Sequence, residues 1–357
     1  MVFRDELKSA VLQLNSNTTS HQFEELALEI FYYQASNNQI YKEYLQHLRV
    51  QPTKMKRIDK IPCLPIDFFK FHTIVSGDAL PQHVFESSGT TGQKTSQHFV
   101  SDLPFYEAVS LKIFEQFYGS ITDYHILALL PSYLERNNSS LIYMVQSFMY
   151  KSFSQKSGFY LHDTHTLLHH LREALIEQKR ANKKVLLVGV TFALLDLAES
   201  NLDLSWLSEY ADTLVVMETG GMKGRRKELI REDVHQILTQ KWGIPVIHSE
   251  YGMTELLSQG YSQGHGLFQT APSMRILLRE VNDPFTYLPN FAIGEREIKE
   301  RKRSKTGGIN VIDLANIDSC SFIETQDLGA YSPDYQSFRI LGRFDHSDVR
   351  GCNLMVI

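Results

Sequence analysis

The pattern of apolar and polar residues divides the chain into stretches of different texture. From Arg4 to about Leu48, apolar residues such as Leu7, Val11 and Phe23 recur at helical spacing, which predicts amphipathic helices. The next stretch, Gln51–Ser76, is rich in prolines and aromatic residues. Such a composition is typical of an extended connector.

Beyond His83, short apolar runs alternate with amphipathic stretches. The apolar runs are His125–Leu130, Lys184–Val190, Thr213–Met217 and Pro245–His248. The stretches with helical periodicity are Leu103–Phe117, Ser139–Phe153, Thr164–Arg180, Phe192–Glu199 and Arg231–Trp242. Strands separated by helices of this length predict βαβ units and a largely parallel sheet that is covered on both faces.

From about Ala271 onward the texture changes to short β-like runs broken by Gly, Pro, Asn and Asp. These runs are Ser273–Leu278, Gly308–Asp313, Ser321–Glu324 and Ser337–Leu341. They predict a smaller antiparallel or barrel-like subdomain. We therefore expect an α/β protein with a helical segment at residues 1–50, an α/β core at 51–270, and a β-rich subdomain with its tail at 271–357.

Composition and charge exclude several classes of protein. The 357 residues carry 36 Lys and Arg against 41 Asp and Glu, a net charge of −5, with 43% hydrophobic residues. Without a concentrated basic surface, a nucleic-acid backbone binder is not expected. The longest nearly unbroken apolar stretch, Val185–Leu195, is about half the length that spans a bilayer, so no integral membrane contact is expected.

The N-terminus and the cysteines favour a cytoplasmic protein. The first eight residues contain early acids and no apolar core of a secretory signal. Cys63, Cys320 and Cys352 are widely spaced and odd in number, and form neither a CxxC pair nor a disulfide framework.

The segment Ser87–Lys94, with the sequence SSGTTGQK, has the composition of a phosphate-binding loop. Two glycines let the backbone turn tightly and direct N–H groups at an anion, while four hydroxyls and one ammonium supply further donors. Its glycines are too close together for a Walker A loop. Taken alone, a single loop of this kind is more often a polar, glycine-containing surface turn.

Three further segments follow in order. His248–Glu255, with the sequence HSEYGMTE, follows an apolar run, where ligand sites of open α/β sheets lie. Asp327–Gly329 and Gly342–Asp345 come later. Together with the Ser87 loop, these segments resemble the adenylate-forming superfamily, which includes acyl-CoA synthetases, firefly luciferase and nonribosomal peptide adenylation domains.

The chain is most similar to the LuxE-type acyl-protein synthetases, a short branch of this superfamily. Three more segments look like that branch: Glu218–Gly224, Ala271–Arg275 and Val311–Asn316. The similarity runs from about Pro62 to Ile357. It implies the adenylate-forming fold, with parallel sheets covered by helices and a small β-rich subdomain, and without the mobile C-terminal domain of the longer relatives.

The resemblance also implies roles for individual residues in binding ATP and Mg²⁺. The β,γ-phosphates would be held by Ser87, Ser88, Gly89, Thr90, Thr91, Gly92 and Lys94. The adenine pocket would be formed by Gly220 and Gly221, with Tyr251 stacked on the ring and Gly252 beside it. Thr254 would contact the α-phosphate and Glu255 would bind Mg²⁺. Asp327 would accept hydrogen bonds from the ribose hydroxyls with help from Arg343, and Asp345 would occupy the hinge position.

Two further groups would complete the reaction. The longer relatives place a catalytic lysine in the mobile domain, and Lys223, followed by Arg225 and Arg226, is our candidate for supplying positive charge at the α-phosphate. Cys352 lies two residues after Arg350, and a guanidinium can lower a thiol pKa. LuxE-type proteins carry an acyl-accepting cysteine near the C-terminus, so Cys352 is the expected acyl acceptor. A small buried cysteine is the alternative.

Other candidate residues are better explained as structural. The histidines at 162, 165, 169 and 170 lack a completing cysteine or acid pair and are expected on a helix surface. Cys63 and Cys320 are expected in the core. The aromatic residues Phe68, Phe69, Phe71, Phe105 and Tyr106 are consistent with a fatty-acyl tunnel or with ordinary core packing.

The sequence thus predicts an ATP-dependent acyl-protein synthetase. It would adenylate a carboxylic acid, most simply a long-chain fatty acid, and pass the acyl group through its own cysteine to a partner such as a reductase or carrier protein. Two alternatives stay open: a ligase that transfers the acyl group to CoA or a carrier, as phenylacetate-CoA ligases do to CoA, and a non-catalytic nucleotide-binding scaffold.

Overall fold

The N-terminal segment of the fold, up to His47, is helical. The computed structural model describes residues 2–88, 94–132, 135–181, 183–220, 229–288, 306–333 and 337–344. Helices α1 (Val2–Gln13), α2 (Ser20–Asn37) and α3 (Gln39–His47) confirm the helical periodicity. Thr19 begins α2 with a capping box, in which its hydroxyl accepts from Gln22 N at 3.2 Å.

The connector after these helices is more structured than predicted. It contains two 3₁₀ turns, η1 (Pro52–Lys54) and η2 (Ile58–Lys60), then β1 (Leu64–Pro65) and the single-turn α4 (Phe68–Phe71). Strand β1 pairs in parallel with β14 (Phe322–Tyr331). A two-residue strand of this kind leaves almost no periodic signal, so sequence reasoning missed it.

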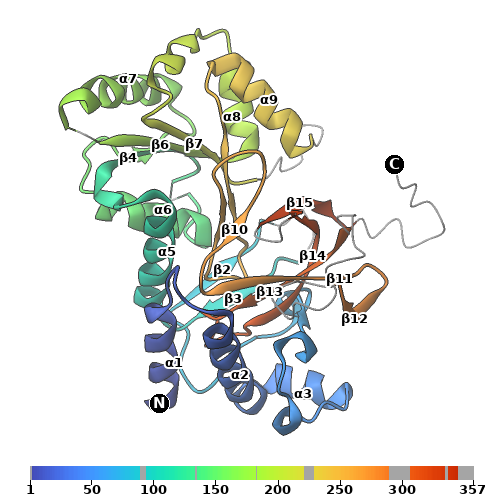
Figure 1. Cartoon of the computed structure of the whole chain (residues 1–357). Coiled ribbons are helices and arrows are strands. Elements are labelled where there is room, and N and C mark those ends of the chain that lie inside the picture. The colour runs from blue at the N-terminus through green and yellow to red at the C-terminus, as the bar shows by residue number, and fades with distance from the viewer. Residues whose placement is uncertain are drawn as a thin grey trace.

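A seven-stranded sheet forms the upper part of the molecule (Figure 1). Its strands are, in spatial order, β10 (Gln269–Thr270), β9 (Gly260–Ser262), β8 (His248–Tyr251), β7 (Leu214–Glu218), β6 (Lys184–Gly189), β4 (Tyr124–Leu129) and β5 (Gly158–Phe159). The strands from β8 to β5 are parallel, and β9 and β10 are antiparallel. The predicted parallel sheet is confirmed.

Helices cover this sheet on both faces, as the alternating pattern predicted. They are α5 (Leu103–Tyr118), α6 (Ser140–Lys151), α7 (Thr164–Ala181), α8 (Thr191–Ala198) and α9 (Arg231–Trp242), with 3₁₀ turns η3 (Ile121–Asp123) and η4 (Ser205–Tyr210). In Figure 1, α7 and α6 lie on opposite sides of β4 and β6. Every residue of β4 is buried, because both of its faces are covered.

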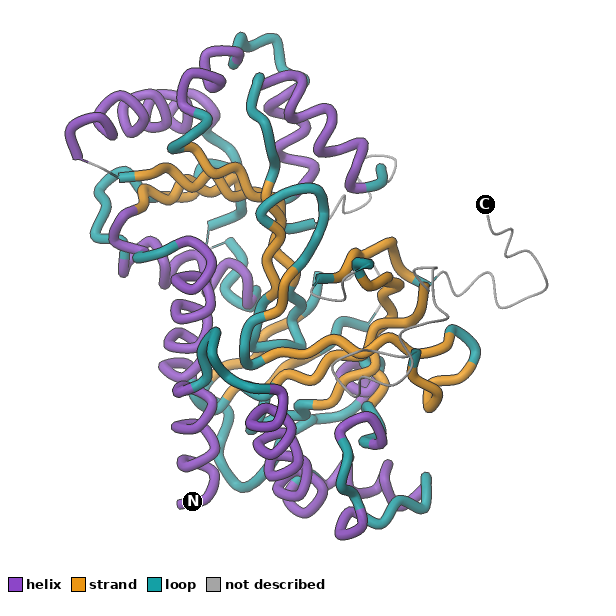
Figure 2. Tube along the Cα trace, in the orientation of Figure 1, coloured by secondary structure: helices purple, strands orange, loops and turns teal. Residues whose placement is uncertain are grey.

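A second sheet of six strands lies below the first (Figure 2). It contains β1, β14, β13 (Thr306–Asp313), β11 (Met274–Glu280), β12 (Asp283–Tyr287) and β15 (Phe338–Arg343). Apart from β1 it is antiparallel, as predicted for this part of the chain. The hairpin β2 (His83–Glu86) and β3 (Gln97–Val100) completes the strands of the described residues.

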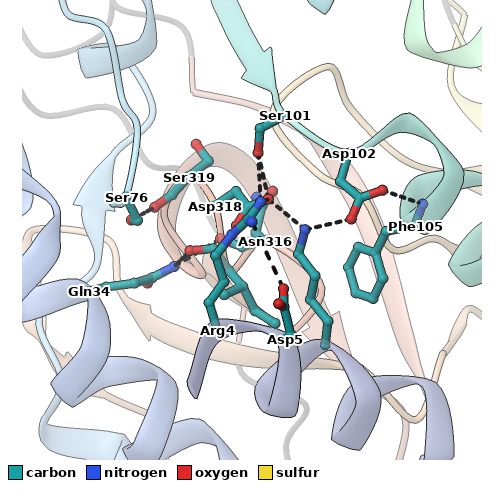
Figure 3. A network of polar contacts seen from close by, with 12 residues as sticks. Arg4, Asp5, Gln34, Ser76, Ser101, Asp102, Phe105, Asn316, Asp318 and Ser319 are labelled. Carbon is teal, nitrogen blue, oxygen red and sulfur yellow. Dashed lines mark hydrogen bonds and ion pairs between the residues drawn. The ribbon is translucent and has the colours of Figure 1, made fainter. Parts of the chain in front are cut away.

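The N-terminal helices pack against the second sheet. The rings of Phe31 and Tyr41 lie 5.9 and 6.2 Å from that of Phe322 on β14. A polar network joins the same parts (Figure 3): Lys8 Nζ of α1 lies 2.8 Å from Asp318 Oδ2 in the loop between β13 and β14. The division of the chain into three parts at residues 50 and 270 stays a prediction. The contacts described here join the first part, residues 1–50, to the last part, residues 271–357.

None of the helices in the described part of the chain combines the length and apolarity needed to cross a bilayer.

Candidate active site

The end of β8 and the segment that follows it carry four of the predicted site residues. Tyr251 is the last residue of the strand, and Gly252, Thr254 and Glu255 follow it directly. The strand begins at His248, three residues later than predicted. Pro245 has no N–H to donate to the ladder, which disfavours it inside a strand. The motif therefore starts inside the strand and ends at its carboxyl edge.

Tyr251, Asp327 and Arg343 form a connected group between the two sheets. Tyr251 Oη donates to Asp327 Oδ2 at 2.9 Å, and Arg343 Nε donates to Asp327 Oδ1 at 3.1 Å. Asp327 and Arg343 are register partners on β14 and β15. The ring of Tyr251 is buried beside Phe268 and Phe338. The structure thus brings three predicted nucleotide contacts together, while the stacking of Tyr251 on adenine stays a prediction.

Thr254 and Glu255 are held by two residues that sequence reasoning did not assign. Asn316 Nδ2 donates to the carbonyl oxygen of Glu255 at 2.6 Å. His98 Nδ1, on β3, lies 2.8 Å from the carbonyl oxygen of Thr254, and burial lowers the pKa of His98 to about 4. The neutral imidazole therefore donates through Nδ1. The sequence contained a hint of Asn316, because this residue lies in the family-like segment Val311–Asn316. It contained no hint of His98.

The Glu255 carboxyl is suited to one part of a Mg²⁺ site. The residue is buried, and this burial raises the pKa of its carboxyl, although a hydrogen bond with Ser96 and the charge of Arg343 act in the opposite direction. No group of three or more metal-ligating side chains occurs among the described residues. Mg²⁺ in nucleotide sites is commonly bound by one or two carboxylates together with phosphates and water. The donor set therefore fits Mg²⁺ bound together with a nucleotide.

The predicted phosphate loop connects β2 to β3. Strand β3 begins three residues after Lys94, the last residue of the predicted loop. Ser87 Oγ accepts from Ser96 N at 2.9 Å, and Ser87 N donates to Ser96 O at 3.1 Å. Because Ser96 also contacts Glu255, the base of the hairpin loop lies beside the segment after β8. Lys94 is exposed, with Nζ 5.2 Å from the centre of the Phe71 ring.

Glu218, the last residue of β7, organises the predicted adenine turn. Its carboxylate accepts from Gly220 N at 2.7 Å, Thr191 Oγ1 at 3.1 Å and Arg231 Nε at 2.9 Å. Burial alone would raise the pKa of Glu218, but His235, Arg231 and other donors lower it to about 2. Gly220 has a φ of +76°, which glycine adopts without strain.

Several predicted residues lie outside the described part of the chain. They are Ser87's loop neighbours Gly89, Thr90, Thr91 and Gly92, then Gly221, Lys223, Arg225, Arg226, Asp345 and Cys352. Ser88 is described and exposed. The roles assigned to all of these residues stay predictions.

The remaining candidates behave mostly as expected. Cys63 and Cys320 are buried, as predicted for core residues, and burial raises the pKa of both thiols, to about 12 for Cys63. Phe69, Phe105 and Tyr106 are buried, whereas Phe71 is 63% exposed. His169 Nε2 lies 3.6 Å from a glutamate oxygen one helical turn along α7.

Comparison with known proteins identifies the family. A model of the LuxE acyl-protein synthetase family matches residues 5–357. The chain belongs to this family. No curated protein sequence matches it.

The fold has relatives among solved structures. ATP-bound MatB from Rhodopseudomonas palustris is 16% identical, with a TM-score of 0.49, over 75% of this chain and 49% of that chain. An ATP-bound RpMatB-BxBclM chimera, B1, is 17% identical with a TM-score of 0.50 and the same coverage. The chain thus spans about half the length of these proteins. The α/β fold of adenylate-forming enzymes, which the sequence predicted, is confirmed.

Proposed function

We propose that the chain is an ATP-dependent acyl-protein synthetase that activates a fatty acid. The fatty-acid carboxylate attacks the α-phosphate of ATP, forming acyl-AMP and releasing pyrophosphate. The Cys352 thiolate then attacks the acyl carbon, AMP leaves, and a thioester forms that a partner protein such as a reductase or carrier accepts. The meeting of Tyr251, Asp327 and Arg343 with the Thr254–Glu255 segment, in a chain of the LuxE family, is the observation that supports this proposal best.

The described residues are suited to bind and orient the nucleotide. The Asp327 carboxylate has two oxygens, each with capacity to accept more than one hydrogen bond, so it can hold ribose hydroxyls while keeping Tyr251 and Arg343. Arg343 is exposed at its outer end and keeps further N–H donors for a phosphate. Mg²⁺ at Glu255 would neutralise charge on the phosphates. Asn316 and His98 fix the backbone that carries Thr254 and Glu255.

The burial of two cysteines supports Cys352 as the acyl acceptor. The thiolate is the nucleophile in thioester formation. Because burial raises the pKa of Cys63 to about 12 and also raises that of Cys320, neither side chain supplies a thiolate near neutral pH. Cys352 is the third cysteine of the sequence, and Arg350 is its near neighbour.

The proposal is tested by intact-mass measurement after incubation with Mg·ATP and a panel of fatty acids. The expected result is an ATP-dependent gain of one acyl group that hydroxylamine removes. Cys352→Ser should abolish the gain, whereas the control Cys63→Ala should retain it. Pyrophosphate release without an adduct would instead support transfer to CoA or a carrier, and the absence of both signals with every acid would support a scaffold.

A further inference from the structure

The face of β8 opposite the Tyr251–Asp327 contact carries a buried acid. Side chains alternate along a strand, so Glu250 projects away from the face on which Tyr251 reaches Asp327. Its partner across the β8–β9 pair is Tyr261, whose ring lies 5.4 Å from that of Tyr118 on α5. Glu250 therefore lies between the sheet and α5.

Polar groups on this face lack hydrogen-bond partners. Tyr261 Oη and Gln259 Oε1 are buried without one. Glu250 is 9% exposed, and no hydrogen bond contributes to its pKa, which only burial and the charge of Glu218 shift. An unsatisfied buried polar group costs about 1–3 kcal/mol, and native proteins contain few of them. Two such groups beside a buried acid indicate a ligand that completes their hydrogen bonds.

The three groups lie next to the segment that carries Thr254. A Cβ placed on Gly252 would be 2.3 Å from Glu250 Oε1 and 3.7 Å from Gln259 Cγ. Gly252 is exposed, so the Glu250 carboxyl borders the surface at this point. Thr254, the proposed α-phosphate contact, is two residues further on. An acid whose carboxylate attacks the α-phosphate has its first carbons in this region.

The hydrogen-bonding character of the cluster matches a hydroxyl group. Burial and the charge of Glu218 raise the pKa of Glu250 to about 8, so near neutral pH most of it is the protonated acid, which both donates and accepts. Gln259 Oε1 only accepts, and Tyr261 Oη does both. A hydroxyl can donate to one of these groups while it accepts from another. An unsubstituted alkyl chain would leave Gln259 Oε1 and Tyr261 Oη unpaired.

We propose that Glu250, Gln259 and Tyr261 recognise a hydroxyl group on the acyl chain, so that hydroxylated fatty acids are the preferred substrates. This inference rests on the proposed acyl-activating function and narrows its substrate class.

Matched acids test the inference through ATP–pyrophosphate exchange. The probes are a straight-chain fatty acid and its hydroxy derivatives, substituted at successive positions near the carboxylate. The wild type should favour at least one hydroxy acid by about 10⁴-fold in kcat/KM, the discrimination that sites built to hydrogen-bond a substrate hydroxyl reach. Glu250→Leu should reduce this preference to within about threefold. Tyr118→Phe is the control that should keep it, because Tyr118 Oη already has His248 Nδ1 at 3.3 Å. The inference would be overturned if the wild type used the straight-chain acid and all of its hydroxy derivatives with equal kcat/KM. It would also be overturned if Glu250→Leu kept the preference for a hydroxy acid.

Stability of the free protein provides an independent test. Tyr261→Phe removes a hydroxyl without a partner and should leave Tm unchanged or raise it, whereas Tyr118→Phe should lower Tm by a few degrees. If Tyr261→Phe lowers Tm as much as Tyr118→Phe does, an ordered water already satisfies the Tyr261 hydroxyl and the inference fails.

Calorimetric binding separates the inference from the proposed function. If no acid supports exchange, the synthetase proposal fails. Tighter binding of a hydroxy acid than of its unsubstituted analogue, lost in Glu250→Leu, would still support the recognition site. Equal binding of both acids, or binding of neither, would overturn it.

Discussion

Replacing Asp318 by asparagine removes the centre of the polar network in Figure 3. Its carboxylate accepts from Ser101 Oγ at 2.6 Å, lies 2.8 Å from Lys8 Nζ, and accepts two hydrogen bonds from the guanidinium of Arg4. The side chains of Arg4 and Lys8 are only 17% and 8% exposed. Asp318→Asn therefore leaves two largely buried cations without their shared anion.

The expected loss is about 3 kcal/mol in the free energy of unfolding. Removing one partner of a buried pair costs about 3–5 kcal/mol, and the lower end applies because Lys8 keeps Asp102 at 2.8 Å. Urea denaturation with an unchanged m value measures this loss. Asp5→Asn is the matched control, because Asp5 is 64% exposed and 4.0 Å from Arg4. Its loss should stay below about 1 kcal/mol.

Acid pH provides a second measure of the Asp318 contribution. Burial alone would raise the pKa of Asp318, but hydrogen bonds from Arg4, Lys8 and Ser101 lower it below its ordinary value. A carboxyl with a lowered pKa in the folded state contributes stability that is present above its unfolded pKa and lost as the pH falls through the folded pKa. The difference between wild type and Asp318→Asn should therefore shrink below about pH 4. A loss at neutral pH that equals the Asp5→Asn loss would refute the reasoning.

Three further outcomes follow from other parts of the fold. Gly308→Ala should destabilise by about 3 kcal/mol in urea denaturation, because its Cβ would lie 2.0 Å from Nη1 of the buried Arg279. The pKa of His98 is about 4, lowered by burial, so the unfolded state binds a proton that the folded state does not. Tm should therefore fall as the pH drops from about 6.5 to 4, by the equivalent of about 3 kcal/mol, and His98→Gln should flatten this part of the profile. Tyr251→Phe removes the hydrogen bond to Asp327 and should raise KM for ATP about tenfold in pyrophosphate exchange, the effect of about 1.4 kcal/mol.

Controls make each of these outcomes decisive. Gly119→Ala places a Cβ in open space at a φ of +83° and should cost only about 1–2 kcal/mol, so an equal loss at Gly308 would contradict the packing argument. His162→Gln changes an exposed histidine and should leave the pH profile as it is. Tyr32→Phe removes a hydrogen bond to the carbonyl oxygen of Met55, which is not part of the candidate site, and should leave KM for ATP unchanged.

The long elements of the fold were predictable because their burial produces periodic patterns. Strand β4 is buried along its whole length and is apolar apart from His125, and α9 buries Val234, Leu238 and Trp242 at helical spacing. The two-residue strands β1, β5 and β10 were not predictable. Each is too short to produce a periodic pattern and is defined by its pairing with another strand: β1 with β14, β5 with β4 and β10 with β9.

The residues of the candidate site that belong to a sequence motif were predictable. The residues that join the site only through packing were not. Tyr251, Asp327 and Arg343 came from motif resemblance, and the structure joins them by hydrogen bonds. His98 was missed, because one histidine in a short strand gives no signal of the carbonyl that it contacts. Glu250 lay inside a motif, but the motif does not reveal its neighbours: Gln259, just before β9, and Tyr261 on β9.

The contacts between α2 and the β13–β14 loop have a consequence for folding during synthesis. Gln34 Nε2 donates to the carbonyl oxygen of Asn316, 282 residues later in the chain, at 2.8 Å. At roughly 10 residues per second, the ribosome needs about half a minute to deliver that partner. The apolar faces of α1–α3 therefore leave the ribosome before most of the second sheet, against which they pack, has been synthesised. Nascent chains of this protein should therefore depend on chaperones early, and a truncation before β13 should aggregate rather than fold.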